Sequence, residues 1–183
     1  PISLEHLNYI PEGMSNNIIW NMGHIIAAQQ GLVYRLSGLT PLVSETFIDK
    51  YKNGSKPDEL TTQEEVNEIK ALLTSTLDQT IVDYEEGKFK NYQEYQTKTG
   101  FLLKNLEDAL QFNNYHEGIH LGFIMKIKPS DSIMTRLLLT IRIPTSKKSL
   151  LHLIILAICS RRSAFWTNGA QNFRQRPHWW SFA

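Results

Sequence analysis

The sequence predicts an all-α protein, a helical bundle, from two observations. In three long segments, apolar residues recur every three or four positions, which is the period of one helix face. Turn-forming and helix-stopping residues separate these segments. The chain has 183 residues, of which 42% are hydrophobic and 20% charged. This length and composition are enough for the buried core of one domain.

The first expected helix runs from Asn16 to about Ser37. Ser15 or Asn16 can cap its start, and Gly38 can cap its end. Its inward face consists of residues three or four apart, namely Trp20, His24, Ala27, Gly31 and Tyr34.

Residues 40–61 are expected to form a loop that contains a short helix near Glu45–Tyr51. A second long helix follows, capped by Thr61 or Thr62, each of which has a glutamate three residues later, as in a capping box. Residues 88–99 then form a connecting loop. The apolar stripe of the second helix consists of Val66, Ile69, Leu73, Leu77, Ile81 and Tyr84.

The third expected helix runs from about Gly100 to Lys128 and stops at Pro129, which cannot continue a helix. Its core positions are spaced alternately by four and three residues, like the seam of a coiled coil. Polar residues hold three positions where leucine is usual. The complete seam is Leu102, Leu106, Ala109, Asn113, His116, His120, Phe123 and Ile127.

Charge divides the chain into two segments. Residues 129–183 carry eight basic residues and one acidic residue, against 11 basic and 17 acidic residues in residues 1–128. We therefore expect a helical bundle over 1–128 and an atypical basic tail, partly helical or disordered, over 129–183.

The composition also limits the partners and the location of the protein. The acidic first segment argues against a nucleic-acid-binding surface. The longest strongly apolar run, Leu150–Ile158, is too short to span a bilayer. A single cysteine, Cys159, excludes an internal disulfide and a thiolate-rich metal site. We expect a cytoplasmic protein that binds neither nucleic acid nor membranes.

Two histidines of the third expected helix suggest a metal site. His116 and His120 are four residues apart, so their side chains lie on one face of the helix. Imidazoles at this spacing can both bind one ion at about 2.0–2.1 Å. His24 is the candidate third ligand, because it is the only histidine on the inward face of the first helix. Small residues beside these histidines are expected to leave room for an ion, a water and a substrate, namely Gly23, Gly118 and Gly122.

Two other interpretations of the histidine pair remain open. The histidines could be core residues without a ligand, although two buried imidazoles without partners cost about 1–3 kcal/mol each. The sequence HEGIH at 116–120 also matches the H-E-x-x-H pattern of zinc proteases, in which Glu117 would be the general base.

Four further polar residues are candidates for contact with a substrate or with the ligands. Asn113 is the strongest, because it lies one helical turn before His116. Gln29, Tyr34 and Glu117 are weaker candidates.

Four stretches, LEHLNYIPEG, NNIIWNMGHIIAAQQ, GLVYRLSGL and YHEGIHLGFIMKIK, resemble the DinB-like (damage-inducible protein) superfamily, especially its uncharacterised bacterial members. The resemblance covers residues 1–128. It implies an up-down-down-up four-helix bundle that holds a divalent metal with three histidines, one on the second helix and two on the fourth. By motif these are His24, His116 and His120, the same residues that spacing selects.

The resemblance also implies a function. Zinc or nickel would be the metal, the protein would be a homodimer, and a small molecule would be its substrate. Some relatives are S-transferases that use a low-molecular-weight thiol as cosubstrate, and others are metal-dependent hydrolases. The alternative is a non-catalytic metal-binding or stress-associated structural protein.

The chain departs from the family pattern at both ends. In the family, one helix precedes the stretch SLEHLNYIPEG, so we expect the bundle to be truncated at its N-terminus, without its first helix. The basic tail is longer than the family domain requires, and its apolar segments could fill the groove of the missing helix or be adventitious.

Overall fold

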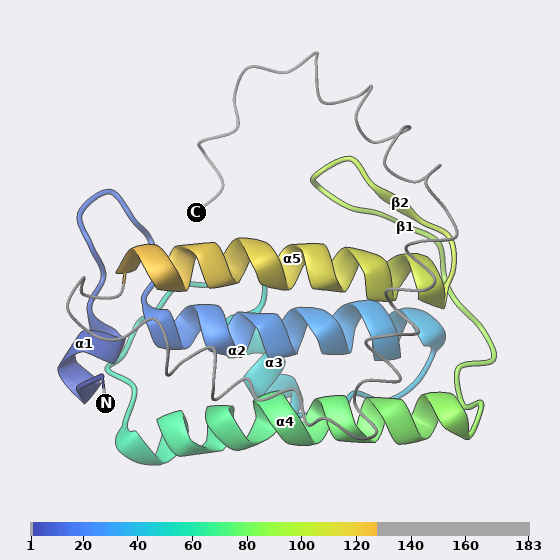
Figure 1. The fold of residues 1–183 in the computed structure, drawn as a ribbon, viewed down its shortest axis with the longest axis horizontal. Coiled ribbons are helices and arrows are strands. Elements are labelled where there is room, and N and C mark those ends of the chain that lie inside the picture. Colours follow the sequence, from blue (N-terminus) through green and yellow to red (C-terminus); the bar gives the residue numbers. More distant parts are fainter. Residues whose placement is uncertain (1, 128–183) are drawn as a thin grey trace.

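The computed structural model describes residues 2–127, in which helices joined by loops form all the regular structure apart from one short hairpin (Figure 1). The all-α prediction is therefore confirmed. The predicted tail, 129–183, lies outside the described residues. The elements are α1 (Leu4–Asn8), α2 (Ile18–Gln29), the π-helical turn η1 (Gln30–Tyr34), the 3-10 turn η2 (Arg35–Ser37), α3 (Glu45–Tyr51), α4 (Gln63–Glu85), β1 (Tyr95–Gln96), β2 (Leu102–Leu103) and α5 (Leu106–Ile127).

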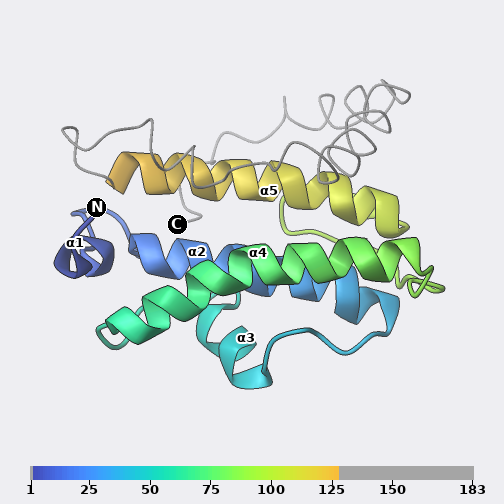
Figure 2. The ribbon, with the colours of Figure 1, turned by 60° about the horizontal axis from the view of Figure 1, so that its bottom comes forward.

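Helix α2 is the centre of the described fold and packs against α1, α3, α4 and α5. Figures 1 and 2 show that α2 and α4 run in the same direction and that α5 runs antiparallel to both. This is the order that an up-down-down-up bundle requires of three successive long helices. The main core lies around α2 and includes Ile18, Ile19, Trp20, Ile26, Val66, Ile69, Ile124 and Ile127.

Helix α2 begins at Ile18, slightly later than the predicted start at Asn16. Its cap is Asn17, not Ser15 or Asn16, and the Asn17 side chain accepts a hydrogen bond from the backbone N–H of Trp20 at 2.7 Å. Helical winding continues through η1 and η2 and ends at Gly38, whose φ of +74° is the left-handed conformation predicted for a C-cap.

Helix α4 starts after Thr62, whose hydroxyl accepts a hydrogen bond from the Glu65 backbone N–H at 3.3 Å. Of the two predicted caps, the structure therefore selects Thr62. The N-terminal half of the predicted apolar stripe is confirmed, because Val66 and Ile69 are fully buried.

The C-terminal half of the predicted α4 stripe is only partly confirmed. Tyr84 is half-buried and packs against the core cluster that contains Tyr34. Leu77, however, is 45% exposed, and the buried residues at this end are Thr76, Thr80 and Asp83. Polar side chains on α2 and η1 face this part of α4 and would be unsatisfied against an apolar stripe. Hydrogen bonds therefore override the apolar period at this end.

The third long helix is shorter than predicted. It begins at Leu106 rather than near Gly100, and residues before it form the β1–β2 hairpin. Gly100 lies in the turn of this hairpin with a φ of +94°, which favours glycine. Asn105 starts the helix instead, since its side chain accepts a hydrogen bond from the Asp108 backbone N–H at 2.8 Å. Leu102 continued the helical period only by coincidence and is 41% exposed in β2.

Across residues 2–127, every helix is too short or too polar to pass through a lipid bilayer.

Candidate metal centre

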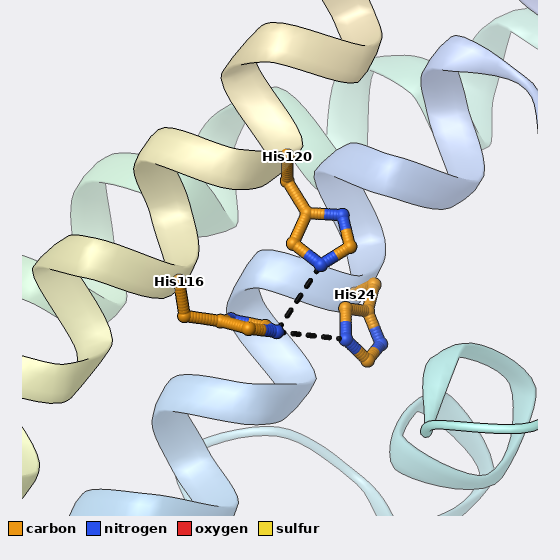
Figure 3. A group of neighbouring side chains, drawn as sticks. All are labelled: His24, His116 and His120. Carbon is orange, nitrogen blue, oxygen red and sulfur yellow. Dashed lines mark hydrogen bonds between the residues drawn. The ribbon is translucent and has the colours of Figure 1, made fainter. Parts of the chain in front are cut away.

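Three histidine side chains meet between the antiparallel helices α2 and α5 (Figure 3). His24 comes from α2, and His116 and His120 come from successive turns of α5. The Nε2 atom of His116 lies 3.3 Å from Nε2 of His24 and 3.1 Å from Nε2 of His120. The three ring nitrogens all lie within 4.8 Å of one another, so one ion could contact all three.

Burial keeps these imidazoles neutral near pH 7. His24 is 4% exposed and His120 is 9% exposed. Burial lowers the pKa of His24, and the hydrogen bond to Tyr51 only partly opposes this. Burial and the neighbouring imidazoles lower the pKa of His116 to about 4 and that of His120 to about 3. Neutral imidazole is the form that binds a metal.

A backbone carbonyl determines which nitrogen of His24 carries the proton. The His24 Nδ1 atom lies 2.7 Å from the carbonyl oxygen of Tyr51, the last residue of α3. This oxygen is at a helix C-terminus, where carbonyls lack an intrahelical partner, and it can only accept a hydrogen bond. His24 therefore donates from Nδ1, and its Nε2 keeps a lone pair that faces the cluster.

Gly23 allows Tyr51 to approach this closely. A Cβ at position 23 would lie 2.5 Å from the Cδ1 atom of the Tyr51 ring, so the ring occupies the space that a side chain would need. The prediction that the glycines leave room for an ion and a substrate is wrong for all three. Tyr51 fills the space at Gly23, while Gly118 and Gly122 are exposed positions where a Cβ would meet nothing within 4 Å.

The side-chain amide of Asn21 determines which nitrogen of His120 carries the proton. The His120 Nδ1 atom lies 2.8 Å from Oδ1 of Asn21, which accepts the hydrogen bond, so the His120 Nε2 also keeps its lone pair. His116 Nδ1 has no hydrogen-bond partner among the described residues. Sequence reasoning missed Asn21 and Tyr51 as the hydrogen-bond partners of His120 and His24.

The donor set fits a cation better than it fits three neutral histidines alone. His116 can place only one hydrogen on Nε2, whereas two lone pairs, from His24 and His120, point at it. One of these two lone pairs is left without a hydrogen-bond donor unless a cation binds all three nitrogens. Three nitrogens at 2.0–2.1 Å from a tetrahedral ion are separated by about 3.3–3.4 Å, close to the 3.3 Å and 3.1 Å found here.

Aromatic rings border the cluster. The indole of Trp20 stacks on His24 with ring centroids 4.7 Å apart and planes 9° apart. Trp20 itself is held by a hydrogen bond from its Nε1 to the Ser55 hydroxyl at 3.0 Å. Phe112 stacks on His116 at 6.1 Å, and Phe123 lies 6.0 Å from His120. Aromatic rings therefore contact all three imidazoles.

The other four candidate residues divide into two pairs. Asn113 is buried and donates from Nδ2 to Glu117 at 2.6 Å, and its Oδ1 has no partner among the described residues. Burial raises the pKa of Glu117, while the hydrogen bond from Asn113 opposes this shift.

The second pair bonds to α4 instead of to the histidines. Gln29 donates to the Thr80 hydroxyl at 2.9 Å, and the Tyr34 hydroxyl donates to Asp83 at 2.6 Å. In the described structure these two residues connect α2 and η1 to the buried polar face of α4.

Fold and site together define a helical-bundle protein whose three converging histidines could hold a metal ion. The chain matches the family model of the DinB superfamily over residues 1–124, which include all three histidines, and it belongs to that superfamily. Comparison with curated proteins produced no match. Comparison with solved structures also produced none.

Proposed function

We propose that this protein is a metal-dependent enzyme that acts on a small molecule, by thiol transfer or by hydrolysis. In this proposal His24, His116 and His120 bind a divalent cation, and zinc and nickel are the favoured ions because imidazole ligands suit both. The observation that carries the proposal is the convergence of three Nε2 atoms, two of which have fixed lone pairs.

Each residue has a definite part in this proposal. His24 and His120 are oriented by their Nδ1 hydrogen bonds, so little reorganisation is needed to bind the ion. Three protein ligands leave at least one coordination position for water or substrate, as in catalytic sites. When bound, the divalent ion supplies Lewis-acid chemistry that favours the deprotonated form of a water or a thiol at neutral pH.

The pair formed by Asn113 and Glu117 would bind the polar part of the substrate. Asn113 has an unpartnered Oδ1, which can accept a hydrogen bond, and lies one turn before His116 on α5. Glu117 orients the Asn113 amide through its hydrogen bond to Nδ2.

The first test is the metal content of tag-free protein by elemental mass spectrometry. We expect about one zinc, nickel or similar ion per chain. Alanine at each of the three histidines should lower the content sharply, because two ligands rarely retain an ion. His6→Ala is the matched control, since His6 lies on α1 outside the cluster. Retention of the metal by His24→Ala would contradict the three-ligand assignment.

A non-catalytic metal-binding protein is the second candidate, and the burial of His24 and His120 favours it. Cobalt-substituted protein distinguishes the two functions. Addition of 2-mercaptoethanol should give a thiolate-to-cobalt charge-transfer band if a thiol reaches an open position. Spectra that do not respond to thiol, azide or other small ligands would mean a closed site and favour the non-catalytic function.

A further inference from the structure

Asn21 is a buried polar residue next to the histidine cluster, and both ends of its amide have hydrogen-bond partners. It is 2% exposed and lies on α2, three residues before His24. Its Nδ2 donates to the carbonyl oxygen of Asn17 at 2.7 Å, and this oxygen can only accept. The orientation of the Asn21 amide is therefore determined, and its Oδ1 must be the atom that faces His120.

Asn17, which accepts the hydrogen bond from Asn21, is itself fixed by hydrogen bonds. The Asn17 side chain accepts from the Trp20 backbone N–H at 2.7 Å and donates to the Asn8 carbonyl oxygen at 3.4 Å. Asn8 in turn exchanges two hydrogen bonds with the Thr61 backbone, at 2.8 Å and 3.0 Å. A chain of buried and half-buried amides thus connects the segment before α4 and helix α1 to Asn21.

We propose that Asn21 is the positioning residue of this site, which selects the Nδ1-protonated tautomer of His120 and holds its ring. Without this acceptor, His120 can carry its proton on Nε2 and direct an N–H group at the other imidazoles. His116 has no Nδ1 partner among the described residues, so only His24 would remain oriented. The effect on metal affinity rests on the proposed function, but the tautomer does not.

Two substitutions separate positioning from packing. Asn21→Leu keeps a similar volume and removes the acceptor. Asn21→Asp keeps an acceptor for His120 but replaces the donor to Asn17 with a buried carboxylate. If Asn21 only packs, the aspartate is at least as damaging as the leucine. If Asn21 positions His120, the aspartate binds metal more tightly than the leucine.

Metal affinity is measured by competition with a chromophoric chelator at pH 8, with zinc as the probe. We expect Asn21→Leu to bind zinc about 10- to 100-fold more weakly than the wild type, and Asn21→Asp to recover most of this loss. Thr80→Val is the matched control, because it removes two buried hydrogen bonds of α4, to Thr76 and from Gln29, away from the histidines. An affinity for Asn21→Asp equal to or below that of Asn21→Leu would overturn the positioning role.

The tautomer is measured in the metal-free protein by two-bond ¹H–¹⁵N NMR of the histidine rings. We expect His120 to be protonated at Nδ1 in the wild type and in Asn21→Asp, and to gain the Nε2-protonated form in Asn21→Leu. Nε2 protonation of His120 in the wild type, or identical spectra for wild type and Asn21→Leu, would overturn the inference. A wild type that binds no zinc but shows this tautomer change contradicts the proposed function and leaves the role of Asn21 intact.

Discussion

The ring of Tyr51 occupies the space beside Gly23 that a side chain would need, and Gly23→Ala tests what this close approach does. The added methyl group would lie 2.5–2.7 Å from three ring carbons of Tyr51. The ring cannot turn outward easily, since Tyr51 is 2% exposed and its hydroxyl donates to Glu65 at 2.6 Å. The ring and its backbone must therefore move, and the Tyr51 carbonyl would move away from His24.

The size of the effect follows from two opposing contributions. Overpacking of a buried position costs about 1–3 kcal/mol. Alanine in place of glycine inside a helix gains about 0.5–1 kcal/mol. Gly23→Ala should therefore lower the free energy of unfolding by about 0–2.5 kcal/mol. Displacement of the carbonyl that orients His24 should also weaken metal binding by about 10- to 100-fold.

Gly118→Ala is the matched control for Gly23→Ala. It lies inside α5 at an exposed position, where a Cβ meets nothing within 4 Å, so only the helix-propensity gain applies. Urea unfolding of both variants then isolates the steric cost, which we expect to be about 1–3 kcal/mol. Equal stability of the two variants, with wild-type metal affinity in both, would refute the role of the Tyr51 contact.

Three further predictions concern stability. Burial holds the pKa of His116 and His120 below 6.5, at about 4 and about 3, so the unfolded chain binds protons first as the pH falls. The metal-free protein should thus lose stability in urea between pH 6.5 and pH 4, and an unchanged midpoint would contradict the buried neutral imidazoles. Asp83→Asn should cost about 1–3 kcal/mol, because it weakens a buried hydrogen bond with Tyr34, and calorimetry should show this at unchanged metal affinity. Thr62→Ala should lower the free energy of unfolding by about 1 kcal/mol, because α4 loses its cap. In thermal unfolding followed by circular dichroism, the total loss of helix signal should equal that of the wild type.

Helix positions could be predicted from the sequence where burial and period agree. The face of α2 that carries Trp20, His24 and Ala27 is buried as expected, and the short helix predicted near Glu45–Tyr51 is α3. Periodicity failed in two places. In α4, the apolar period does not predict that buried hydroxyls and a carboxylate form hydrogen bonds with polar groups of the neighbouring helix.

The second failure is the start of α5. Leu102 lies four residues before Leu106, as a helix face would require, but the left-handed Gly100 closes a hairpin turn first. A glycine at the edge of an apolar period was the available signal, and it indicates a turn as readily as a helix start.

The candidate site could be predicted in its histidines but not in the groups that orient them. The spacing of His116 and His120, with His24 on an inward face, was enough to select the cluster that the structure brings together. The Tyr51 partner is a backbone carbonyl, and any residue type has one, so no residue pattern identifies it. Asn21 was visible in the W-N-x-G-H stretch, but its partner lies 99 residues away.

An ion bound by His24 and His116 would also cross-link the chain. The two residues are 92 positions apart, so the bound ion would close most of the described fold into one covalent-like loop. For a cross-link of this span, the chain-entropy model gives a stabilisation of about 4–5 kcal/mol. The sequence has one cysteine and therefore no internal disulfide, so the bound ion would act as its cross-link. His24 also contacts the Tyr51 carbonyl at the end of α3, so this cross-link would extend to a helix that contributes no ligand. Removal of the ion by a chelator should therefore loosen α3 as well.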